Sequence, residues 1–427
     1  MKKYQIETQC VQGTYKPESG QPRVLPIAQS TTYQYYDSDD VADLFDLKSA
    51  THMYSRISNP TVSEFENKMA LLEGGVGALG ASSGQAATTL AILNICQQGD
   101  HVISASTIYG GTYNLFAVTL KKLGIEVTFV NPDASIEEIV ALGNEKTKAL
   151  FGETIGNPGL NVLDFDKFSR AAKELDVPLL IDNTLATPYL CRPFEHGADI
   201  VIHSTTKYTD GHATSVGGVI IDGGSFNWDN GKFPELVQPD PSYHGIQYVK
   251  DFGKSAYITK ARVQLLRDLG TTMSPFSAFL FHLGLETLHL RMERHSENAL
   301  KLGEFLEKHP GVSWVHYPKL DSHKTYALAE KYLPKGGSGI LTFGIKGGST
   351  AGKELIKHMN LTALVVHLGD LRTSILHPAS TTHRQLTEEQ QISAGVLPDL
   401  IRVSVGLENI DDIIRDFDEA INAVANI

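Results

Sequence analysis

The sequence predicts an α/β protein with a large domain built on a mostly parallel, doubly wound sheet and a smaller α+β domain after it. Between about residues 61 and 270, short apolar runs alternate with segments of helical spacing, as strands and crossover helices do in such sheets. The runs are Val102–Ser104, Glu126–Val130, Ala149–Phe151, Leu179–Ile181 and Ile200–Ile202. After residue 270 strands and helices follow in mixed order, which indicates the second domain.

Helices are expected where apolar residues recur at helical spacing, and the remaining strands where short apolar runs stand alone. The segment Ser63–Leu72 has helical spacing and stops before a glycine pair that can cap it. Further helices are expected at Ala86–Ile95, at Leu288–Leu306 and from about Ile410 onward. Strands of the second domain are expected at Gly339–Phe343 and Leu400–Val405.

The chain is divided at about residues 60 and 270. Residues 1–60 are polar and interrupted by prolines, and we expect them to form an N-terminal arm that contacts a neighbouring subunit. Residues 61–270 then form the large domain and residues 271–427 the C-terminal domain. Residues 221–250 are rich in Gly, Pro and aromatic residues, and such a long loop usually has a functional or interface role.

Composition excludes several classes of protein. With 41% hydrophobic and 20% charged residues, the chain has the composition of a globular protein. Its net charge of −12 argues against nucleic-acid binding, which requires a basic surface. No apolar stretch approaches the roughly 20 residues that span a bilayer, and the N-terminus lacks the apolar region of a signal peptide. Three widely separated cysteines fit the reducing cytoplasm, where we expect the protein.

Lys207 and Asp182 are the most informative residues. Each lies at or just after the end of a short apolar run, and open α/β sheets bind ligands at the carboxyl ends of their strands. An amine and an acid delivered there suit pyridoxal phosphate (PLP), which takes a lysine Schiff base and needs an acid to keep its pyridine nitrogen protonated. Taken alone, either residue could instead be a solvated lysine or a helix-capping aspartate.

Small polar residues near the same edge could bind a phosphate. Ser83, Gly84 and Gln85 begin a helix, where free backbone N–H groups and the helix dipole attract anions. Ser204 and Thr206 could add hydroxyl donors. The alternatives are an ordinary serine N-cap and the turn chemistry that follows a strand.

Three more side chains are candidates for cofactor or substrate contacts. Tyr109 could stack on a flat ring, although tyrosines more often simply pack. Asn157 could bind a ring hydroxyl, although Asn-Pro also marks turns. Because Ile401 and Val403 occupy the core face of a strand, Arg402 points the other way, where it could clamp a substrate carboxylate or form a surface ion pair.

Two motifs are rejected. Gly75–Gly80 matches the dinucleotide-binding glycine pattern, but it follows a helix instead of a strand, so no dehydrogenase is expected. His377 and His383 have no carboxylate partner at metal-ligand spacing, so no metal site is expected.

Taken together, these residues resemble the Cys/Met-metabolism family of PLP-dependent enzymes, which have fold type I, and the resemblance covers nearly the whole chain. Four segments carry it, namely Tyr54–Thr61, Ser82–Gln85, Asp182–Thr184 and His203–Lys207. Within the family the resemblance is greatest to the sulfhydrylase branch, which acts on O-acetylhomoserine. This choice depends on Glu153–Pro158, on the long insert that ends at Pro239–Gly245, and on Gly111, where methionine γ-lyases carry a cysteine.

The resemblance implies roles for these residues. Lys207 would form the Schiff base with PLP, Asp182 would pair with the pyridine nitrogen, and Tyr109 would stack on the ring and assist the leaving group. The PLP phosphate would be held by Ser83, Gly84, Gln85, Ser204 and Thr206. Tyr54 and Arg56 would reach the phosphate of a neighbouring subunit, so a homo-oligomer, expected to be a tetramer, is implied.

On the substrate side, the resemblance implies that Arg402 binds the carboxylate. His367 stands where relatives usually have Ser or Asn, and Leu185 where Phe is usual, so one substrate contact differs from the family pattern.

The implied activity is a γ-replacement that exchanges the acetate of O-acetylhomoserine for sulfide or methanethiol, giving homocysteine or methionine. Within the family, methionine or cystathionine γ-lyase and cystathionine γ-synthase remain alternatives, and a fold-type I aminotransferase is a more distant one. A non-catalytic scaffold is the alternative from another class. The sulfur donor, which could also be a protein thiocarboxylate, and the acyl group of the ester stay open.

Overall fold

The computed structural model describes residues 4–49, 51–382, 384, 387, 389 and 395–424. Within these residues, the large domain is built on a seven-stranded sheet with the order β1-β7-β6-β5-β4-β2-β3. Strand β7 is antiparallel to its neighbours β1 and β6, and the other neighbouring strands are parallel. The strands are β1 (Gly77–Ala81), β2 (His101–Ala105), β3 (Glu126–Val130), β4 (Thr147–Glu153), β5 (Leu179–Asp182), β6 (Ile200–His203) and β7 (Gly218–Asp222).

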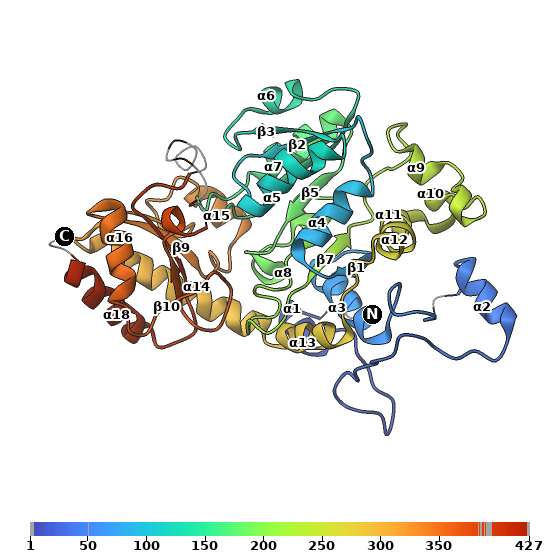
Figure 1. Cartoon of the computed structure of the whole chain (residues 1–427), viewed down its shortest axis with the longest axis horizontal. Coiled ribbons are helices and arrows are strands. Elements are labelled where there is room, and N and C mark those ends of the chain that lie inside the picture. The colour runs from blue at the N-terminus through green and yellow to red at the C-terminus, as the bar shows by residue number, and fades with distance from the viewer. Residues whose placement is uncertain are drawn as a thin grey trace.

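Helices surround this sheet (Figure 1). Helices α3 and α4 contact β1 and β7, and α7 contacts β4 and β5. The helices of this region are α3 (Pro60–Glu73), α4 (Gly84–Leu93), α5 (Gly110–Asn114), α6 (Ile136–Ala141), α7 (Phe165–Leu175), α8 (Thr187–Leu190), α9 (Pro234–Val237), α10 (Tyr248–Phe252), α11 (Ala256–Lys260), α12 (Arg267–Leu269) and α13 (Pro275–Glu286). The predicted α/β architecture with a mostly parallel sheet is confirmed.

Two strands of the seven-stranded sheet, β1 and β7, escape sequence prediction. The five residues of β1 are Gly, Ala, Leu, Gly and Ala, which lack the β-branched and aromatic side chains typical of strands. Strand β7 ends inside the segment expected to be a loop, where residues 223–250 indeed carry only short helices. The glycine pattern at 75–80 runs into β1 and opens no helix, so the structure gives the dinucleotide-binding motif no support.

The C-terminal region has a second, five-stranded sheet with the order β10-β11-β12-β9-β8, in which only β10 and β11 are parallel. Its strands are β8 (Val312–His316), β9 (Ile340–Ile345), β10 (Ala363–Leu364), β11 (Ser374–Leu376) and β12 (Leu400–Ser404). Its helices are α14 (Leu288–Lys308), α15 (Tyr326–Tyr332), α16 (Gly348–Lys357) and α18 (Ile410–Val424). This mixed arrangement is the expected α+β domain.

The two sheets have separate apolar cores that meet along α14. Met292 packs in the larger core, whereas Ala299 packs in the smaller one. The buried residues of α13, including Phe281, belong to the larger core. We therefore propose that the domain boundary lies within α14, C-terminal to the position near residue 270 that the sequence suggests.

The N-terminal segment begins with α1 (Ile6–Gln12), which the sequence does not predict and which packs against α3, α13 and α14. Cys10 on this helix is fully buried. After α1 the chain extends away from the body and carries α2 (Ser38–Phe45) at its far end (Figure 1). Tyr36 is 96% exposed and Phe45 59% exposed, so this stretch packs little against its own chain.

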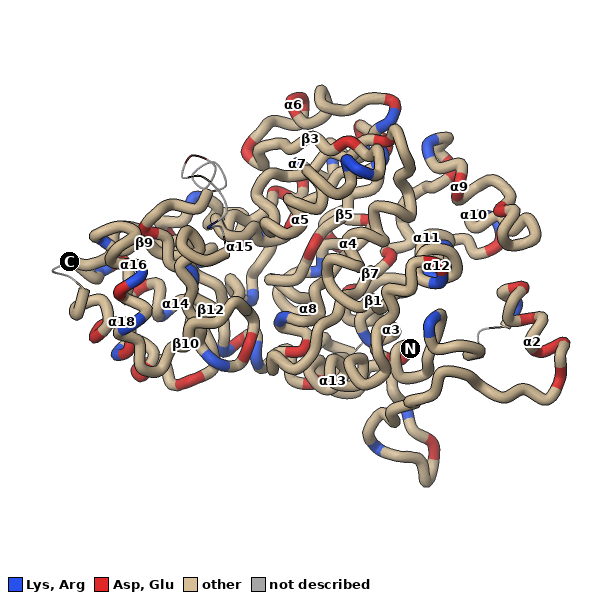
Figure 2. The backbone as a smooth tube through the Cα atoms, in the orientation of Figure 1, with Lys and Arg blue, Asp and Glu red and all other residues tan. Residues whose placement is uncertain are grey.

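Charged side chains of both signs are interspersed along the described chain (Figure 2). Within the described residues, no helix has the length and apolar character needed to cross a bilayer.

Candidate active site

The candidate site lies at the carboxyl ends of β4, β5 and β6. Glu153 pairs with Asp182 across β4 and β5, and Asp182 pairs with Ile202 of β6. The chain then turns after β6, and the backbone N–H of Lys207 donates to the carbonyl of Ser204 at 3.2 Å. The acid and the amine therefore reach one edge of the sheet, as the positions of the apolar runs predict.

The Lys207 amine loses its proton more easily than a free lysine amine does. Burial, together with a smaller effect of the positive charge of nearby Arg402, lowers the pKa of its side chain from 10.5 to about 8. A neutral amine is the form that attacks a carbonyl or accepts a proton. Gly369 lies against the backbone here, since a Cβ added to it would be 2.9 Å from the backbone nitrogen of Tyr208.

The buried amine should lower the stability of the apoprotein. Since the pKa is depressed in the folded state, the penalty is complete below pH 8 and disappears as the pH rises to 10.5. The shift from 10.5 to about 8 corresponds to roughly 3 kcal/mol. We expect Lys207→Met apoprotein to unfold at a higher temperature than wild-type apoprotein at pH 7, with the difference shrinking between pH 8 and pH 10. If the Lys207→Met apoprotein were more stable than the wild-type apoprotein by the same amount at pH 7 and at pH 10, the assignment of Lys207 as a buried amine would be contradicted.

Asp182 and Glu153 form a pair of adjacent carboxyl groups. Burial raises the pKa of Asp182, opposed by the backbone N–H of Thr184, which donates to its Oδ1 at 2.9 Å. Burial and the charge of Asp182 raise the pKa of Glu153 well above its usual value, so of the two carboxyl groups Glu153 is the one whose protonated form is more strongly favoured. The backbone N–H of Tyr109 donates to Glu153 Oε1 at 2.7 Å.

The start of α4 meets the turn after β6. Ser83 is the N-cap of α4, and its hydroxyl accepts from the Ala86 N–H at 3.0 Å. A Cβ added to Gly84 would lie 2.6 Å from the Ser204 Cβ, so only glycine allows this approach. The carbonyl oxygen of the Gln85 side chain is buried and has no hydrogen-bond partner among the described residues. Thr206 differs, because its hydroxyl exchanges hydrogen bonds with backbone atoms of Gly217 at 3.1 and 3.2 Å.

Tyr109 and Asn157 lie at the rim of the same edge. Tyr109 caps α5 and is 51% exposed, with its backbone anchored on Glu153. Asn157 is buried and precedes Pro158 through a cis peptide bond. The adjoining loop is held by the side chain of Asn161, which donates to the Thr107 hydroxyl at 3.0 Å.

Arg402 and His367 approach Lys207 from the C-terminal domain. Ile401 and Val403 pack in the smaller core, so Arg402 points to the opposite face of β12. Burial lowers the pKa of His367, and the charge of Lys207 lowers it further, so its imidazole is neutral. The buried Nε2 of His367 has no hydrogen-bond partner in the described part of the chain.

Tyr54 and Arg56, unlike the other predicted site residues, lie outside the cluster around Lys207 within one chain. Arg56 lies 5.4 Å from the centroid of the Tyr54 ring, and its guanidinium donates to the backbone carbonyl of Arg267 in α12. Both side chains are exposed, so within one chain they do not form part of the cluster around Lys207.

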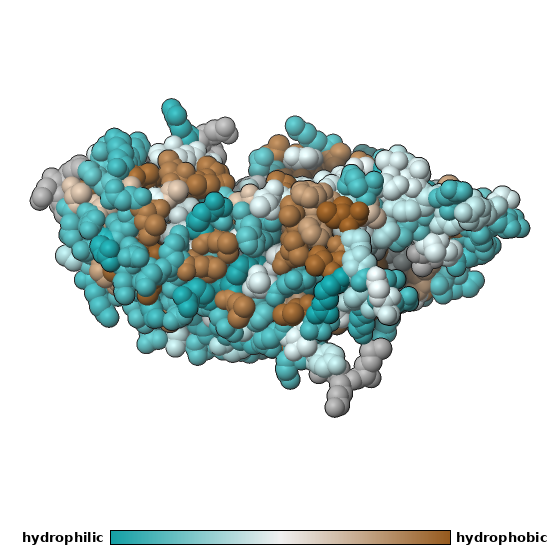
Figure 3. Space-filling model, turned by 90° about the horizontal axis from the view of Figure 1, so that it is seen from below, coloured by the Kyte–Doolittle hydropathy of each residue, from teal (hydrophilic) through white to brown (hydrophobic). Residues whose placement is uncertain are grey.

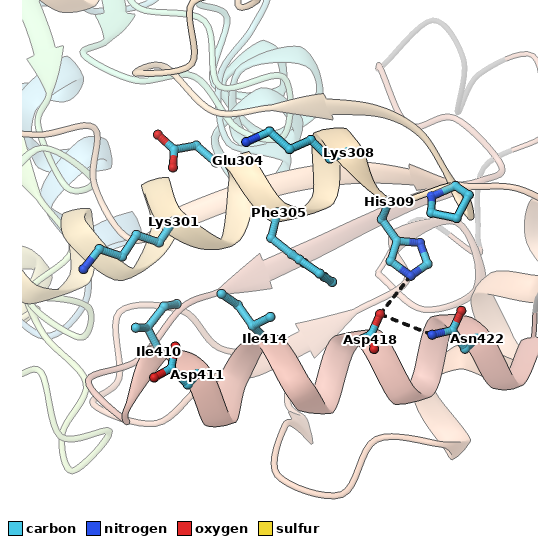
Figure 4. Close-up of a pocket in the computed structure, with 11 residues that line it drawn as sticks. Lys301, Glu304, Phe305, Lys308, His309, Ile410, Asp411, Ile414, Asp418 and Asn422 are labelled. Carbon is cyan, nitrogen blue, oxygen red and sulfur yellow. Dashed lines mark hydrogen bonds and ion pairs between the residues drawn. The ribbon is translucent and has the colours of Figure 1, made fainter.

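The residues present fit PLP. The helix start and the serine hydroxyls offer donors for a phosphate, Asp182 offers a buried carboxylate for a cationic ring nitrogen, and Lys207 offers an amine of lowered pKa. The described residues contain no group of three or more His, Cys, Asp or Glu that could hold a metal ion, and His383 lies outside them. A surface groove between α14 and α18, lined by Phe305 and the His309–Asp418 pair, contains none of the site residues (Figure 4).

Sequence reasoning gave no role to three residues of this cluster. Glu153 closes an apolar strand as Asp182 does, which could have identified it. Thr184 follows Asp182 by two residues, and its hydroxyl accepts from the Ser204 N–H at 2.8 Å. Glu73 lies beneath the sheet at the end of α3, and no local pattern places it there.

A family model described as "Cys/Met metabolism PLP-dependent enzyme" matches residues 7–422 of the chain. The chain belongs to this family. An O-acetyl-L-homoserine sulfhydrylase of Leptospira meyeri is 50% identical over 431 residues, covering 99% of this chain and 97% of its own. A homocysteine synthase of Schizosaccharomyces pombe is 48% identical, covering 93% of this chain and 94% of its own.

Solved structures of family members agree. A Campylobacter jejuni structure assigned as an O-acetylhomoserine (thiol)-lyase, which contains a pyridoxyl-lysine phosphate, has a TM-score of 0.94 at 37% identity. It covers 98% of this chain, and this chain covers all of it. Corynebacterium glutamicum MetB has a TM-score of 0.84 at 31% identity, covering 99% of this chain and 98% of its own. Membership confirms the predicted fold type and the prediction of PLP as cofactor.

Proposed function

We propose that the chain is an O-acetylhomoserine sulfhydrylase, which replaces the acetate of O-acetylhomoserine by sulfide or methanethiol and yields homocysteine or methionine. The observation that carries the proposal is the buried Lys207 amine of lowered pKa, which lies near the Arg402 guanidinium at the sheet edge that holds the buried Asp182. The relatives named for this activity, at 45–50% identity over almost their full length, support it.

When bound, PLP supplies the electron sink that stabilises negative charge beside an amino group. The Lys207 amine accepts and returns protons at the neighbouring carbons of the substrate. Asp182 would keep the ring nitrogen cationic, and the phosphate would be held by Ser83, Gly84, Gln85, Ser204 and Thr206. Tyr109 would cover the ring, and Asn157 would bind its hydroxyl.

Residues of the C-terminal domain would bind the substrate. The guanidinium of Arg402 is shaped for a two-point contact with the α-carboxylate. His367, neutral and with an unpaired nitrogen, offers a hydrogen bond to the substrate. Acetate leaves with the electron pair of its C–O bond, and the sulfur nucleophile forms the new C–S bond at the same carbon.

Gly111 favours the sulfhydrylase over methionine γ-lyase, which carries a cysteine at this place. A Cβ on Gly111 would be 2.6 Å from the Gln85 side-chain nitrogen and would also collide with the Tyr109 ring. The local packing is therefore adapted to glycine.

Product analysis tests the proposal. The holoenzyme should release homocysteine and acetate from O-acetylhomoserine plus sulfide, more rapidly than from the O-succinyl or O-phospho ester. Methanethiol in place of sulfide distinguishes the two donors. Abundant 2-oxobutyrate and methanethiol from L-methionine alone would instead identify a γ-lyase, and a colourless, inactive protein would identify a scaffold.

Replacing Arg402 by lysine should weaken substrate capture. Lysine keeps the charge but loses the two-point geometry, and damaging a buried charge contact costs about 2–5 kcal/mol. We expect kcat/KM for O-acetylhomoserine to fall at least about 30-fold, with the absorbance of bound PLP unchanged. Arg415→Lys, at an exposed arginine of α18 that pairs with Asp412, is the matched control. Equal kinetics for the two variants would remove Arg402 from the substrate site.

We further propose a homotetramer in which the stretch after α1, which contains Tyr54 and Arg56, reaches a neighbouring subunit; α1 itself packs on its own chain. Phe276, Leu283 and Leu290 of α13 and α14 are 55%, 36% and 58% exposed. Apolar side chains gather on the face seen from below, where α13 lies (Figure 3). A cytoplasmic location is also proposed, because the three cysteines are free and buried.

The arm can be tested by mixing inactive variants. Arg56→Ala and Lys207→Ala should each be inactive, but co-expressed chains should regain activity because one supplies Lys207 and the other the arm. Random pairing in a two-fold symmetric dimer gives roughly a quarter of wild-type activity. No recovery, despite hybrid oligomers seen by native mass spectrometry, would show that the arm serves its own chain.

A further inference from the structure

Glu73 and His203 form a buried pair on the far face of the sheet from Asp182. Glu73 ends α3 and His203 ends β6, and their side chains are 0% and 1% exposed. The His203 Nε2 lies 2.6 Å from Glu73 Oε1. A buried carboxylate of this kind is costly unless it is paired, so the two groups must be considered together.

The pair continues into a row of side chains along the strand ends. Asn183 donates from its amide nitrogen to the same Glu73 oxygen at 2.8 Å, and it accepts from the Thr154 hydroxyl at 2.7 Å. Neighbouring strands pair at Glu153, Asp182 and Ile202. The row consists of the residues that follow these three by one position, namely Thr154, Asn183 and His203. Because side chains alternate between the faces of a strand, this row lies directly behind the two carboxyl groups of the site.

The row of side chains can influence the ionisation of Asp182. Asp182 is buried beside Glu153, and burial disfavours its ionised form. The charge of His203 acts in the opposite direction and lowers the pKa of Asp182. Cys191 also lies near the pair: its carbonyl accepts from Asn183, and its buried thiol has a raised pKa and stays neutral.

We propose that Glu73 and His203 are positioning residues that keep Asp182 ionised and its strand end in place, so that Asp182 can hold the cationic ring nitrogen of PLP. Glu73 holds the imidazole in place, and the imidazole favours the ionised form of Asp182 from the opposite face of the sheet. This inference rests on the role proposed above for Asp182, but not on the identity of the substrate.

His203→Gln and Glu73→Gln in the holoenzyme test the inference. Both should weaken PLP binding about tenfold, as couplings within one network do. Removing the imidazole removes an influence that lowers the pKa of Asp182, so the acidic limb of the pH profile of kcat should move up by about one unit. The visible absorbance of bound PLP should titrate with the same displacement, while KM changes little.

Glu66→Gln is the matched control for structural damage. Glu66 is also buried on α3, but its carboxylate pairs with Arg262 at 2.7 Å and accepts from the Gly80 N–H, and neither partner belongs to the row behind Asp182. We expect this variant to lose thermal stability without changing PLP affinity or the pH profile. If Glu66→Gln and His203→Gln lower PLP affinity equally, the pair is merely structural and the inference is overturned.

A double-mutant cycle separates this inference from the proposed role of Asp182. In an Asp182→Asn background, His203→Gln should have no further effect on PLP affinity, because its target is gone. Additive losses would overturn the action through Asp182. If Asp182→Asn alone leaves PLP affinity and absorbance unchanged, the role of Asp182 itself fails.

Discussion

Lys207→Ala is expected to abolish turnover, with a loss of roughly 10³-fold or more, because the variant loses both its covalent anchor for PLP and its proton carrier. The visible absorbance of the covalently bound cofactor should disappear from the purified protein. Steady-state kinetics and an absorbance spectrum of the same sample measure both effects.

The control for this prediction is a second buried lysine. The pKa of Lys260 is also lowered to about 8 by burial, but its amine donates to the Asn94 carbonyl at 2.9 Å, away from the strand ends. Lys260→Met should therefore keep the chromophore and its activity. The low pKa alone does not identify the cofactor lysine, and an active, yellow Lys207→Ala would refute the assignment.

Asp182→Asn is expected to lower kcat by roughly 10²-fold or more, the range seen when a key electrostatic contact is removed from an active site. The amide keeps the acceptor for the Thr184 N–H but loses the negative charge that stabilises a cationic ring nitrogen. PLP should also dissociate more readily, which dialysis followed by reconstitution can measure.

Asp222→Asn is the comparison for this second prediction. Burial raises the pKa of Asp222 to about 7, and this acid closes β7 by accepting from the Gly224 N–H at 2.8 Å, outside the site. This variant should retain kcat and PLP affinity. If Asp182→Asn is equally harmless, the carboxylate has no electrostatic role at the cofactor.

The central strands of the large sheet are predictable because they are buried on both faces. Strands β2, β5 and β6 therefore each contain a short apolar run, which is the sequence pattern of a strand buried on both faces. Strand β1 is not predictable in this way, since its small residues serve close packing; a Cβ on Gly80 would lie 3.3 Å from the Met273 sulfur.

The residues of the candidate site also include some that the sequence predicts and some that it does not. Lys207 and Asp182 are visible in the sequence because each is polar at the end of an apolar run. The Glu73–His203 pair joins residues 130 positions apart, and no local pattern reports such a contact. Tyr54 and Arg56 come from a segment that packs little on its own chain, so their role depends on a second subunit and remains a proposal.

Borohydride reduction of the holoenzyme, followed by digestion and peptide mapping, tests the central claim most directly, because it fixes the cofactor to the amine that holds it. The account predicts a single pyridoxyl-labelled peptide, modified at Lys207. A label on Lys68, Lys260 or any other side chain, or no label at all, would contradict it.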